Sequence, residues 1–303
     1  MTKQRKDMGA SVRARLLQLA KQRGDDFQLL LTRYANERLL YRLSKSQHGN
    51  AFLLKGAALF TLWTGHAHRA TRDMDLLGFG EPSIQRLRDV FDEVIALELD
   101  DDGVVFDSTT LKVEPIREDQ LYGDIRIVLV ARITNAQVRL QVDVGFGDAV
   151  TPEAQLVEFP PLLDLPAPQL RAYPKETVVA EKLDAIVQLG LANTRMKDFY
   201  DLVALSNLFD FEGQLLVAAI SATFTRRGTP LPTEPPAAFT PEFTGDATKN
   251  VQWTAFVKKA GVVGAADLKS TIELVELFVQ RPLHAAAEKQ PFAGRWSPPG
   301  PWT

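Results

Sequence analysis

The stretch Arg69–Gly80, RATRDMDLLGFG, places Asp73 and Asp75 one residue apart at the front of an apolar run. Side chains alternate between the two faces of a strand, so both carboxylates point to one face while Met74 and Leu76 point to the other. A carboxylate on a buried strand needs a positive partner, because burying an unpaired charge is costly. The stretch therefore predicts a strand with a cation beside its two aspartates.

A second strand, expected at residues 138–144, shows the same division between its faces. Its valines and leucine share one face, and Asp143 lies on the opposite one. If the two strands are neighbours, Asp143 joins Asp73 and Asp75 on a common polar face. Three carboxylates close together repel one another unless a hard cation such as Mg²⁺ or Mn²⁺ lies between them. A D-x-D sequence is also common in surface turns, so the third aspartate in matching phase is what indicates a metal site.

Length and composition indicate a soluble globular protein with one large domain or two smaller ones. The chain has 303 residues, of which 45% are hydrophobic and 24% charged. The absence of cysteine excludes disulfides and cysteine-ligated zinc. The opening sequence lacks the apolar core of a secretory signal, and no apolar run is long enough to span a bilayer. We therefore expect a cytoplasmic protein with no membrane partner.

The first fifty residues are basic, with eleven Lys and Arg against four Asp and Glu, although the whole chain has a net charge of −3. Such a segment could bind a phosphate backbone. A solvated helical face would explain the same charge, and charge alone favours that simpler interpretation.

Hydrophobic periodicity predicts an α+β fold, with a mixed-sheet core followed by a helical C-terminal region. Helices are expected over residues 11–45, with a break at Gly24 and with Asp25 capping the second helix. Asn135 and Ala136 read as the turn of a hairpin, and prolines between residues 160 and 168 mark a connection. The boundaries that follow are a basic helical segment at 1–48, a core at 49–160 and a helical domain at 170–303.

Two residues of the helical region have side chains suited to chemistry. Lys182 falls inside the apolar stripe of its helix, between Val178 and Ile186, where it must meet an anion or extend to the helix edge. Asp198 opens the next helix, which it could simply cap. Sixteen residues separate Lys182 from Asp198, so two adjacent helices could present both groups to one cleft.

Small residues at Gly56, Ala57 and Ala58 begin a predicted helix directly after a predicted strand. Such residues let backbone N–H groups approach a phosphate closely. Close packing of the helix on the strand would explain them equally well.

Taken in order, these motifs resemble the AbiEii/AbiGii family of nucleotidyltransferase toxins from bacterial toxin–antitoxin systems. The family's first motif is a KGG or KGS turn followed by R-x-T/S-x-D-x-D, and it is matched by Lys55-Gly56-Ala57 and by Arg69 to Asp75. The later motifs are matched by Asp143, Glu181-Lys182, Lys197 to Leu202, and a proline-rich tract followed by Trp253. The resemblance runs from about residue 50 to residue 280. At Ala57 the chain departs from the family's usual Gly or Ser. An alanine can still offer its backbone amide to a phosphate, but it lacks the hydroxyl contact that a serine would make.

The resemblance implies a polymerase-β-like nucleotidyltransferase core that uses Mg²⁺ or Mn²⁺ and an NTP. In that family's terms, Asp73 and Asp75 would hold the metal, and Asp143 would complete its shell or act as a base. Lys182 would pair with the triphosphate and Asp198 would orient Lys182 or the nucleotide. Further contacts to the nucleotide are implied for Lys55, Gly56, Ala57, Arg69 and Thr71.

The implied activity is transfer of a nucleotide, with a pyrimidine expected, to an RNA acceptor such as the 3′ end of tRNA, which would block translation. A cognate antitoxin is an implied partner, and the basic first segment would suit an RNA acceptor. Two alternatives remain: an NTP-dependent transferase with a protein or small-molecule acceptor, and an inactive relative that only binds a partner. The carboxylates and the lysine of the motifs are all present, which favours an active enzyme over the last alternative.

Overall fold

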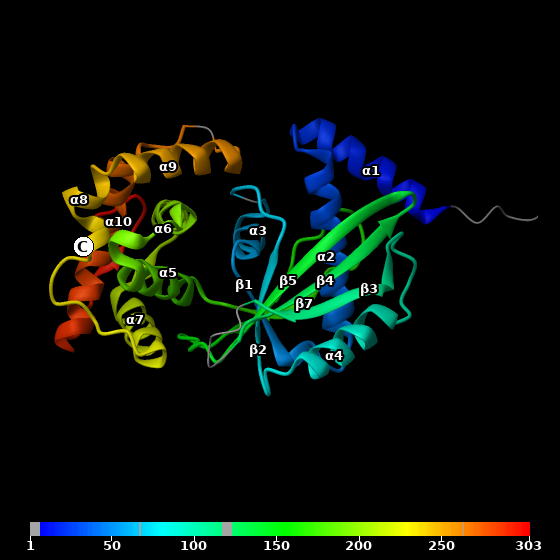
Figure 1. Cartoon of the computed structure of the whole chain (residues 1–303), viewed down its shortest axis with the longest axis horizontal. Coiled ribbons are helices and arrows are strands. Elements are labelled where there is room, and N and C mark those ends of the chain that lie inside the picture. Colours follow the sequence, from blue (N-terminus) through cyan, green and yellow to red (C-terminus); the bar gives the residue numbers. More distant parts are fainter. Residues whose placement is uncertain (1–6, 67, 117–122, 263) are drawn as a thin grey trace, which may run out of the picture. The chain divides into compact units, whose positions relative to one another are not determined.

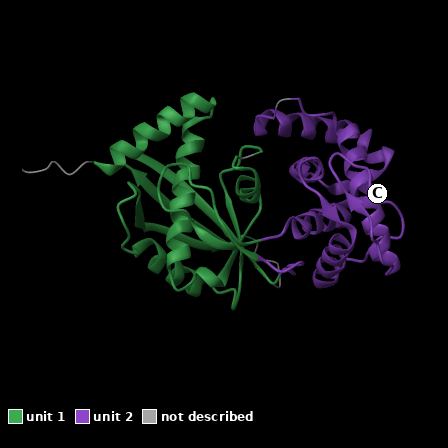
Figure 2. Cartoon of the chain, turned by 180° about the vertical axis from the view of Figure 1, so that it is seen from behind, with its two compact units in different colours: residues 1–147, 155–172 green, residues 148–154, 173–303 purple. Residues whose placement is uncertain are grey.

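The computed structural model describes residues 7–66, 68–116, 123–262 and 264–303 (Figure 1). The chain divides into two compact units, coloured separately in Figure 2. The first unit is Met1–Gly147 with Gln155–Ala172, and the second is Asp148–Ala154 with Tyr173–Thr303. A mixed sheet in the first unit and helices in the second confirm the predicted α+β class.

The first unit is a seven-stranded sheet with helices. Its elements are α1 (Met8–Arg23), α2 (Phe27–Lys45), η1 (Gly49–Ala51), β1 (Phe52–Lys55), α3 (Ala58–Thr64), β2 (Met74–Gly78), α4 (Ile84–Ala96), β3 (Val105–Pro115), β4 (Ile125–Ile133), β5 (Ala136–Phe146), β6 (Gln155–Glu158) and β7 (Gln169–Ala172). The strand order is β3-β4-β5-β2-β1-β7-β6, in which β2 and β5 are parallel, as are β1 and β7, and the other neighbours are antiparallel.

One face of the sheet is apolar and carries the core of this unit. In the central strands, Met74 of β2 pairs with Val142 of β5, which pairs with Ile127 of β4, and all three are buried. Phe52 of β1 contacts Phe91 of α4 edge-on, with ring centroids 6.1 Å apart, so α4 covers this face. Side chains alternate between the two faces of a strand. The residues next to Met74, Val142 and Ile127 in sequence therefore point away from α4, to the opposite face of the sheet.

The break between the first two helices lies where the sequence predicts it, but a different residue caps the second helix. Gly24 ends α1 in the left-handed conformation, with φ of 71°. The Asp26 carboxylate accepts a hydrogen bond from the Leu29 amide at 2.7 Å and so forms the N-cap of α2. The expectation that Asp25 is the cap was therefore wrong: its carboxylate faces Arg33 at 3.8 Å instead.

The sheet also extends further than the sequence indicates. The residues on either side of the prolines at 160–168 form an antiparallel pair, β6 and β7, and β7 adds to the sheet edge parallel to β1. Each of these strands has four residues. Segments so short carry little periodic pattern, and they form strands because a neighbouring strand supplies hydrogen bonds.

The second unit is mostly helical. Its elements are α5 (Lys175–Leu189), η2 (Gly190–Ala192), α6 (Met196–Leu208), β8 (Phe211–Glu212), α7 (Gly213–Arg227), η3 (Ala237–Phe239), α8 (Pro241–Thr244), α9 (Ala247–Ala260), α10 (Leu268–Glu288) and β9 (Arg295–Trp296). Trp296 and Trp302 pack on Phe278 of α10, and the Trp296 indole donates a 2.7 Å hydrogen bond to the Ser206 carbonyl. Within the part of the chain that the structure describes, none of the helices has the length and apolar content of a membrane span.

A buried ion pair fastens α2 to the segment between α4 and β3. The Arg42 guanidinium donates to both carboxylate oxygens of Asp102, at 2.6 and 3.1 Å, and both side chains are less than a tenth exposed. Removal of one member of such a pair leaves an uncompensated buried charge.

We predict that Arg42→Met lowers the free energy of unfolding by about 3–5 kcal/mol, because Asp102 then stays buried without its cation. Arg42→Met combined with Asp102→Asn should recover part of this loss, and Arg139→Met, at an exposed position of β5, should change it by less than about 0.5 kcal/mol. Urea denaturation followed by circular dichroism measures all three. A double variant as unstable as the single one would contradict this explanation.

Candidate active site

The face of the sheet opposite α4 carries a row of charged residues across five neighbouring strands. Lys55 on β1 pairs with Asp75 on β2, and Asp75 pairs with Asp143 on β5. Asp143 in turn pairs with Arg126 on β4, and Arg126 with Glu114 on β3. Directly paired residues of antiparallel strands have their Cβ atoms about 4.5–5.5 Å apart, and neighbouring strands in general lie about 4.7–4.9 Å apart. Two adjacent carboxylates therefore lie at the centre of the row with one cationic residue on each side.

Arg126 neutralises one of the two central carboxylates. Its Nε and Nη2 donate to the two Asp143 oxygens at 2.8 and 2.9 Å, a bidentate arrangement. These hydrogen bonds raise the pKa of Arg126 against the opposing effect of burial, and the charges of Asp143, Asp73 and Glu114 raise it further. The protein itself thus supplies part of the positive charge that the sequence requires beside the carboxylates.

The other central carboxylate, that of Asp75, lies against the backbone of Gly56. Gly56 has φ of 73°, and a Cβ atom built there would lie 2.0 Å from Asp75 Oδ2. Both the left-handed backbone and the close approach exclude a side chain at this position. The turn after β1 therefore fixes the place of the Asp75 carboxylate.

Lys55 reaches across the sheet toward β5. A Cβ atom at Gly145 would lie 3.2 Å from Lys55 Nζ and 3.3 Å from Asp124 Oδ1, so both groups lie over this glycine. The ammonium group of Lys55 is therefore on the same face as Asp75 and Asp143. Ala57, which follows the Gly56 turn, is buried and precedes α3, a helix of seven residues.

The arrangement fits a magnesium ion that a nucleotide brings with it. Among the described residues, no three His, Asp or Glu side chains converge closely enough to form a metal site by themselves. Magnesium is usually held by one or two carboxylates together with substrate phosphates; Asp75 lies on β2, and Asp73 directly precedes the strand. Asp143 can also contribute, because a carboxylate that accepts two hydrogen bonds from Arg126 has further lone pairs.

A second cluster of charges lies in the helical unit. Lys182 of α5 donates to Asp198 at 2.9 Å and to Asp201 at 2.8 Å, and Arg195 donates to Asp198 at 2.6 Å. Both carboxylates are about 1% exposed, and two cations balance two anions. Burial would raise the pKa of Asp198, but the charges of Lys182 and Arg195 outweigh it and hold the pKa below its ordinary value.

Residues 38–271 match the family described as nucleotidyl transferase AbiEii toxin, of type IV toxin–antitoxin systems. The chain belongs to this family.

Two solved structures are similar to this AbiEii chain. JHP933 from Helicobacter pylori has 15% sequence identity and a TM-score of 0.48, over 87% of this chain and 95% of that one. An H. pylori structure described as that of a candidate nucleotidyltransferase has 15% identity and a TM-score of 0.49, over 87% of this chain and 98% of that one. No curated protein matches the chain.

The remaining residues that the AbiEii motifs single out lie before β2. Arg69 is half-buried, and the Thr71 hydroxyl donates to the Asp73 carbonyl at 3.5 Å. Asp73 is exposed and precedes the first residue of β2. The structure thus places Lys55, Asp75 and Asp143 together on the sheet and Lys182 with Asp198 on adjacent helices, all on regular elements.

Sequence reasoning missed two charged residues of these clusters, Arg195 and Arg126, and gave no role to Asp201 of the matched Lys197 to Leu202 motif. Asp201 lies three positions after Asp198 on α6, a spacing that puts both on one helix face, so helical periodicity could have indicated its role. Arg195 directly precedes the same helix. Arg126 has no comparable signal, because its role depends on which strand pairs with β5.

We predict that Gly56→Ala destabilises the AbiEii fold more than Gly24→Ala does. Both glycines have positive φ, for which a side chain costs about 1–2 kcal/mol, but a Cβ at Gly24 meets nothing within 4 Å. Gly56→Ala should lower the free energy of unfolding by at least about 1 kcal/mol more than Gly24→Ala does, as at overpacked sites. This difference measures the contact between Gly56 and Asp75. Equal unfolding free energies in urea would show that Asp75 is not held against Gly56.

A further prediction concerns Lys182→Met, which leaves two buried carboxylates with less positive charge beside them. We expect a loss of about 3–5 kcal/mol in unfolding free energy at pH 7. The pKa of Asp198 is lower in the folded state than in the unfolded state, where it is about 4. This difference stabilises the wild type at a pH above the unfolded-state pKa, and the stabilisation is lost as the pH falls through the folded-state pKa. The difference between wild type and variant should therefore shrink below about pH 4.

Urea titrations between pH 7 and pH 3 measure this difference. Lys197→Met, at the exposed neighbouring position on α6, is the matched control and should follow the wild type at each pH. A Lys182→Met difference that stays constant down to pH 3 would contradict the assigned linkage to Asp198.

Proposed function

We propose that this protein is a metal-dependent nucleotidyltransferase that transfers a nucleotide from an NTP to an RNA acceptor, with the 3′ end of tRNA as the expected target. The observation that carries the proposal is the pair of in-register carboxylates, Asp75 and Asp143, the first of which lies against the Gly56 turn, in a chain of the AbiEii toxin family. Modification of the acceptor end would block translation, and this is how the protein would act as a toxin in the cytoplasm.

In this proposal Asp73 and Asp75 hold Mg²⁺ or Mn²⁺ on the nucleotide, with Asp143 adding a ligand through its remaining lone pairs. A bound metal would clamp the triphosphate and offset its negative charge. Lys55 and the backbone at Gly56 and Ala57 contact the phosphates, and Arg69 and Thr71 contribute at the edge of the site.

Lys182 is proposed to stabilise the charge that develops as pyrophosphate leaves. The acceptor hydroxyl passes its proton to Asp143 as the base or to solvent water, its oxygen forms a bond to the α-phosphorus, and the bond from that phosphorus to the departing pyrophosphate breaks. Asp198 and Asp201 act as positioning residues, because their hydrogen bonds hold the Lys182 ammonium in one place. Such preorganised charges stabilise a transition state without reorganising during the reaction.

The partners implied by this function are an NTP, for which a pyrimidine is expected, an RNA acceptor and a cognate antitoxin. The basic character of residues 1–50 supports an RNA acceptor, because cationic side chains contribute most of the affinity for a phosphate backbone. A neighbouring gene for a small regulator would support the toxin role.

We predict that the purified protein with Mg²⁺ labels total tRNA from at least one of the four NTPs, each tested separately. Asp75→Asn should lower the rate at least about 100-fold, because it removes a charged ligand of the metal, and Asp100→Asn, at an exposed loop position, should keep the wild-type rate. Chelation with EDTA should abolish labelling, and excess Mg²⁺ should restore it.

The same assay separates the alternatives. Label found in protein or in a small molecule, and not in RNA, would identify a different acceptor for the same chemistry. No transfer from any NTP to RNA or to lysate components, with either Mg²⁺ or Mn²⁺, would refute the enzymatic function and leave a binding protein.

A further inference from the structure

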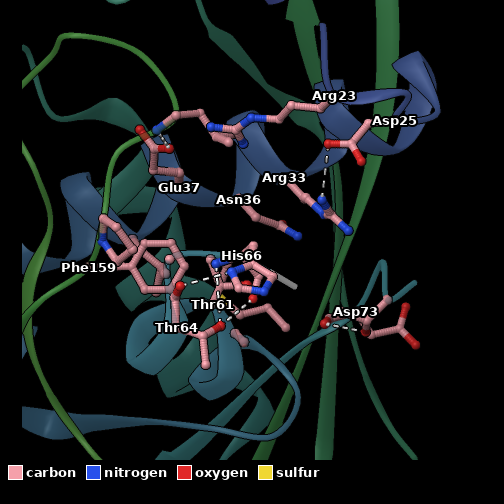
Figure 3. Close-up of a pocket in the computed structure, with 17 residues that line it drawn as sticks. Arg23, Asp25, Arg33, Asn36, Glu37, Thr61, Thr64, His66, Asp73 and Phe159 are labelled. Carbon is pink, nitrogen blue, oxygen red and sulfur yellow. Dashed lines mark hydrogen bonds and ion pairs between the residues drawn. The ribbon is translucent and has the colours of Figure 1, made fainter. Parts of the chain in front are cut away.

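The first unit contains a cavity of about 580 Å³ (Figure 3), and its lining includes Thr71 and Asp73, which the proposed function places at the edge of the nucleotide site and on the metal. Its walls come from α2, from α3 and the residues after it, from Asp73 and Met74 at the start of β2, and from the loop at residues 159–162, with Arg23 and Asp25 at the turn between α1 and α2. The volume lies within the range of about 300–1,000 Å³ that is typical of small-molecule sites.

The cavity is lined by both apolar and polar side chains. The apolar lining is made by Leu40, Ala58, Met74, Phe159, Pro160 and Leu162. Among the polar residues, Figure 3 shows Arg33 and Asn36 of α2 on one wall and Thr61 and His66 on the wall across the cavity. A flat ring with polar edges suits such a lining, because its faces need apolar contacts and its edges need hydrogen bonds.

Two buried atoms on the α2 wall lack partners. Within the described residues, neither the Asn36 Oδ1 acceptor nor the Arg33 Nε donor has a hydrogen-bond partner. The other polar atoms of these side chains have partners, since Asn36 Nδ2 donates to the Arg72 carbonyl at 3.1 Å and Arg33 faces Asp25 at 3.8 Å. The two residues lie three positions apart and share one face of α2. Both atoms have almost no accessible surface, so a ligand edge that carries an acceptor and a donor pairs with them when the two side chains turn toward the cavity.

The charge near Arg33 points to the same kind of ligand. Burial lowers the pKa of Arg33; Asp25 opposes this effect, and the positive charge of Arg23 adds to it. An electron-rich group in the cavity would relieve the desolvated guanidinium. Asp73, which the proposed function assigns to the metal, lines the same cavity.

We propose that this cavity binds the nucleoside of one reactant, with the base against the apolar side chains of the lining, its edge on Asn36 and Arg33, and its sugar toward Asp73. The inference rests on the proposed function, because it places the base beside the residue that would hold the metal. A nucleoside can come from either the NTP or the terminal nucleotide of the acceptor RNA, and both present the same chemistry to the cavity.

The first experiment measures binding without catalysis. Saturation-transfer NMR and calorimetry with UMP, CMP, AMP and GMP, in the absence of metal, should detect binding of at least one of them. Asn36→Leu removes the acceptor, and Thr61→Phe fills the cavity from the opposite wall. Each should weaken binding about tenfold or more, the effect expected when one hydrogen bond to a buried group is lost. Gln28→Leu, an amide-to-leucine change at an exposed position of the same helix, is the matched control and should bind like the wild type.

The second experiment identifies the source of the nucleoside. In the transfer assay, Asn36→Leu and Thr61→Phe should raise the KM for the NTP alone if the cavity holds its base, or the KM for the RNA alone if it holds the acceptor's last nucleotide. Either result supports the proposal. Unchanged KM values for both reactants in folded variants would overturn it.

The two proposals fail separately. If the wild type transfers no nucleotide but still binds a nucleoside monophosphate that Asn36→Leu releases, the cavity assignment stands and the enzymatic function falls. If transfer occurs while none of the four monophosphates binds, or while Asn36→Leu and Thr61→Phe bind like the wild type, the cavity assignment falls and the function stands. Circular dichroism melts confirm that each variant is folded.

Discussion

The carboxylate of Asp75 rests on the backbone of Gly56, and this contact ties the end of β1 to the middle of the charged row. No side chain fits between them, so the turn after β1 and the strand β2 keep one spacing. Strand pairing then places Asp143 beside Asp75 and Arg126 beside Asp143. The proposed metal ligands thus take their positions mainly from backbone hydrogen bonds, and groups on strands are held more precisely than groups on loops.

Much of this arrangement was readable from strand phase. Alternation alone put Asp73, Asp75 and Asp143 on potential polar faces, and only the pairing of β2 with β5 was needed to bring the last two together. The role of Arg126 was not readable, because it depends on the pairing of β4 with β5. The strands β6 and β7 were missed for a related reason, since four-residue strands take their conformation from a neighbouring strand. The cavity was beyond sequence analysis, because its walls come from segments more than a hundred residues apart in the chain.

The two charge clusters differ in burial, and their consequences differ accordingly. The row on the sheet is partly open, with Arg126 one-third exposed and Asp143 one-fifth exposed. The cluster around Lys182 has two carboxylates almost fully enclosed. Enclosing ion pairs adds little net stability, because desolvation offsets the attraction between the charges. What enclosure provides is a fixed direction for the Lys182 ammonium, and fixed charges are what a charge-stabilising role requires.

The short segment Asp148–Ala154 leaves the first unit after β5 and returns to it before β6. Within the second unit, Thr151 exchanges two hydrogen bonds with Thr177, at 2.9 and 2.8 Å, and Asp148 pairs with Arg227 at 3.0 Å. The second unit is therefore made of two separate stretches of sequence. A fragment that begins after Ala172 would lack residues 148–154, which belong to the second unit. Recombination that exchanges this half between relatives has to carry two separate pieces of sequence, which couples the inheritance of the two halves more tightly than a simple linker would.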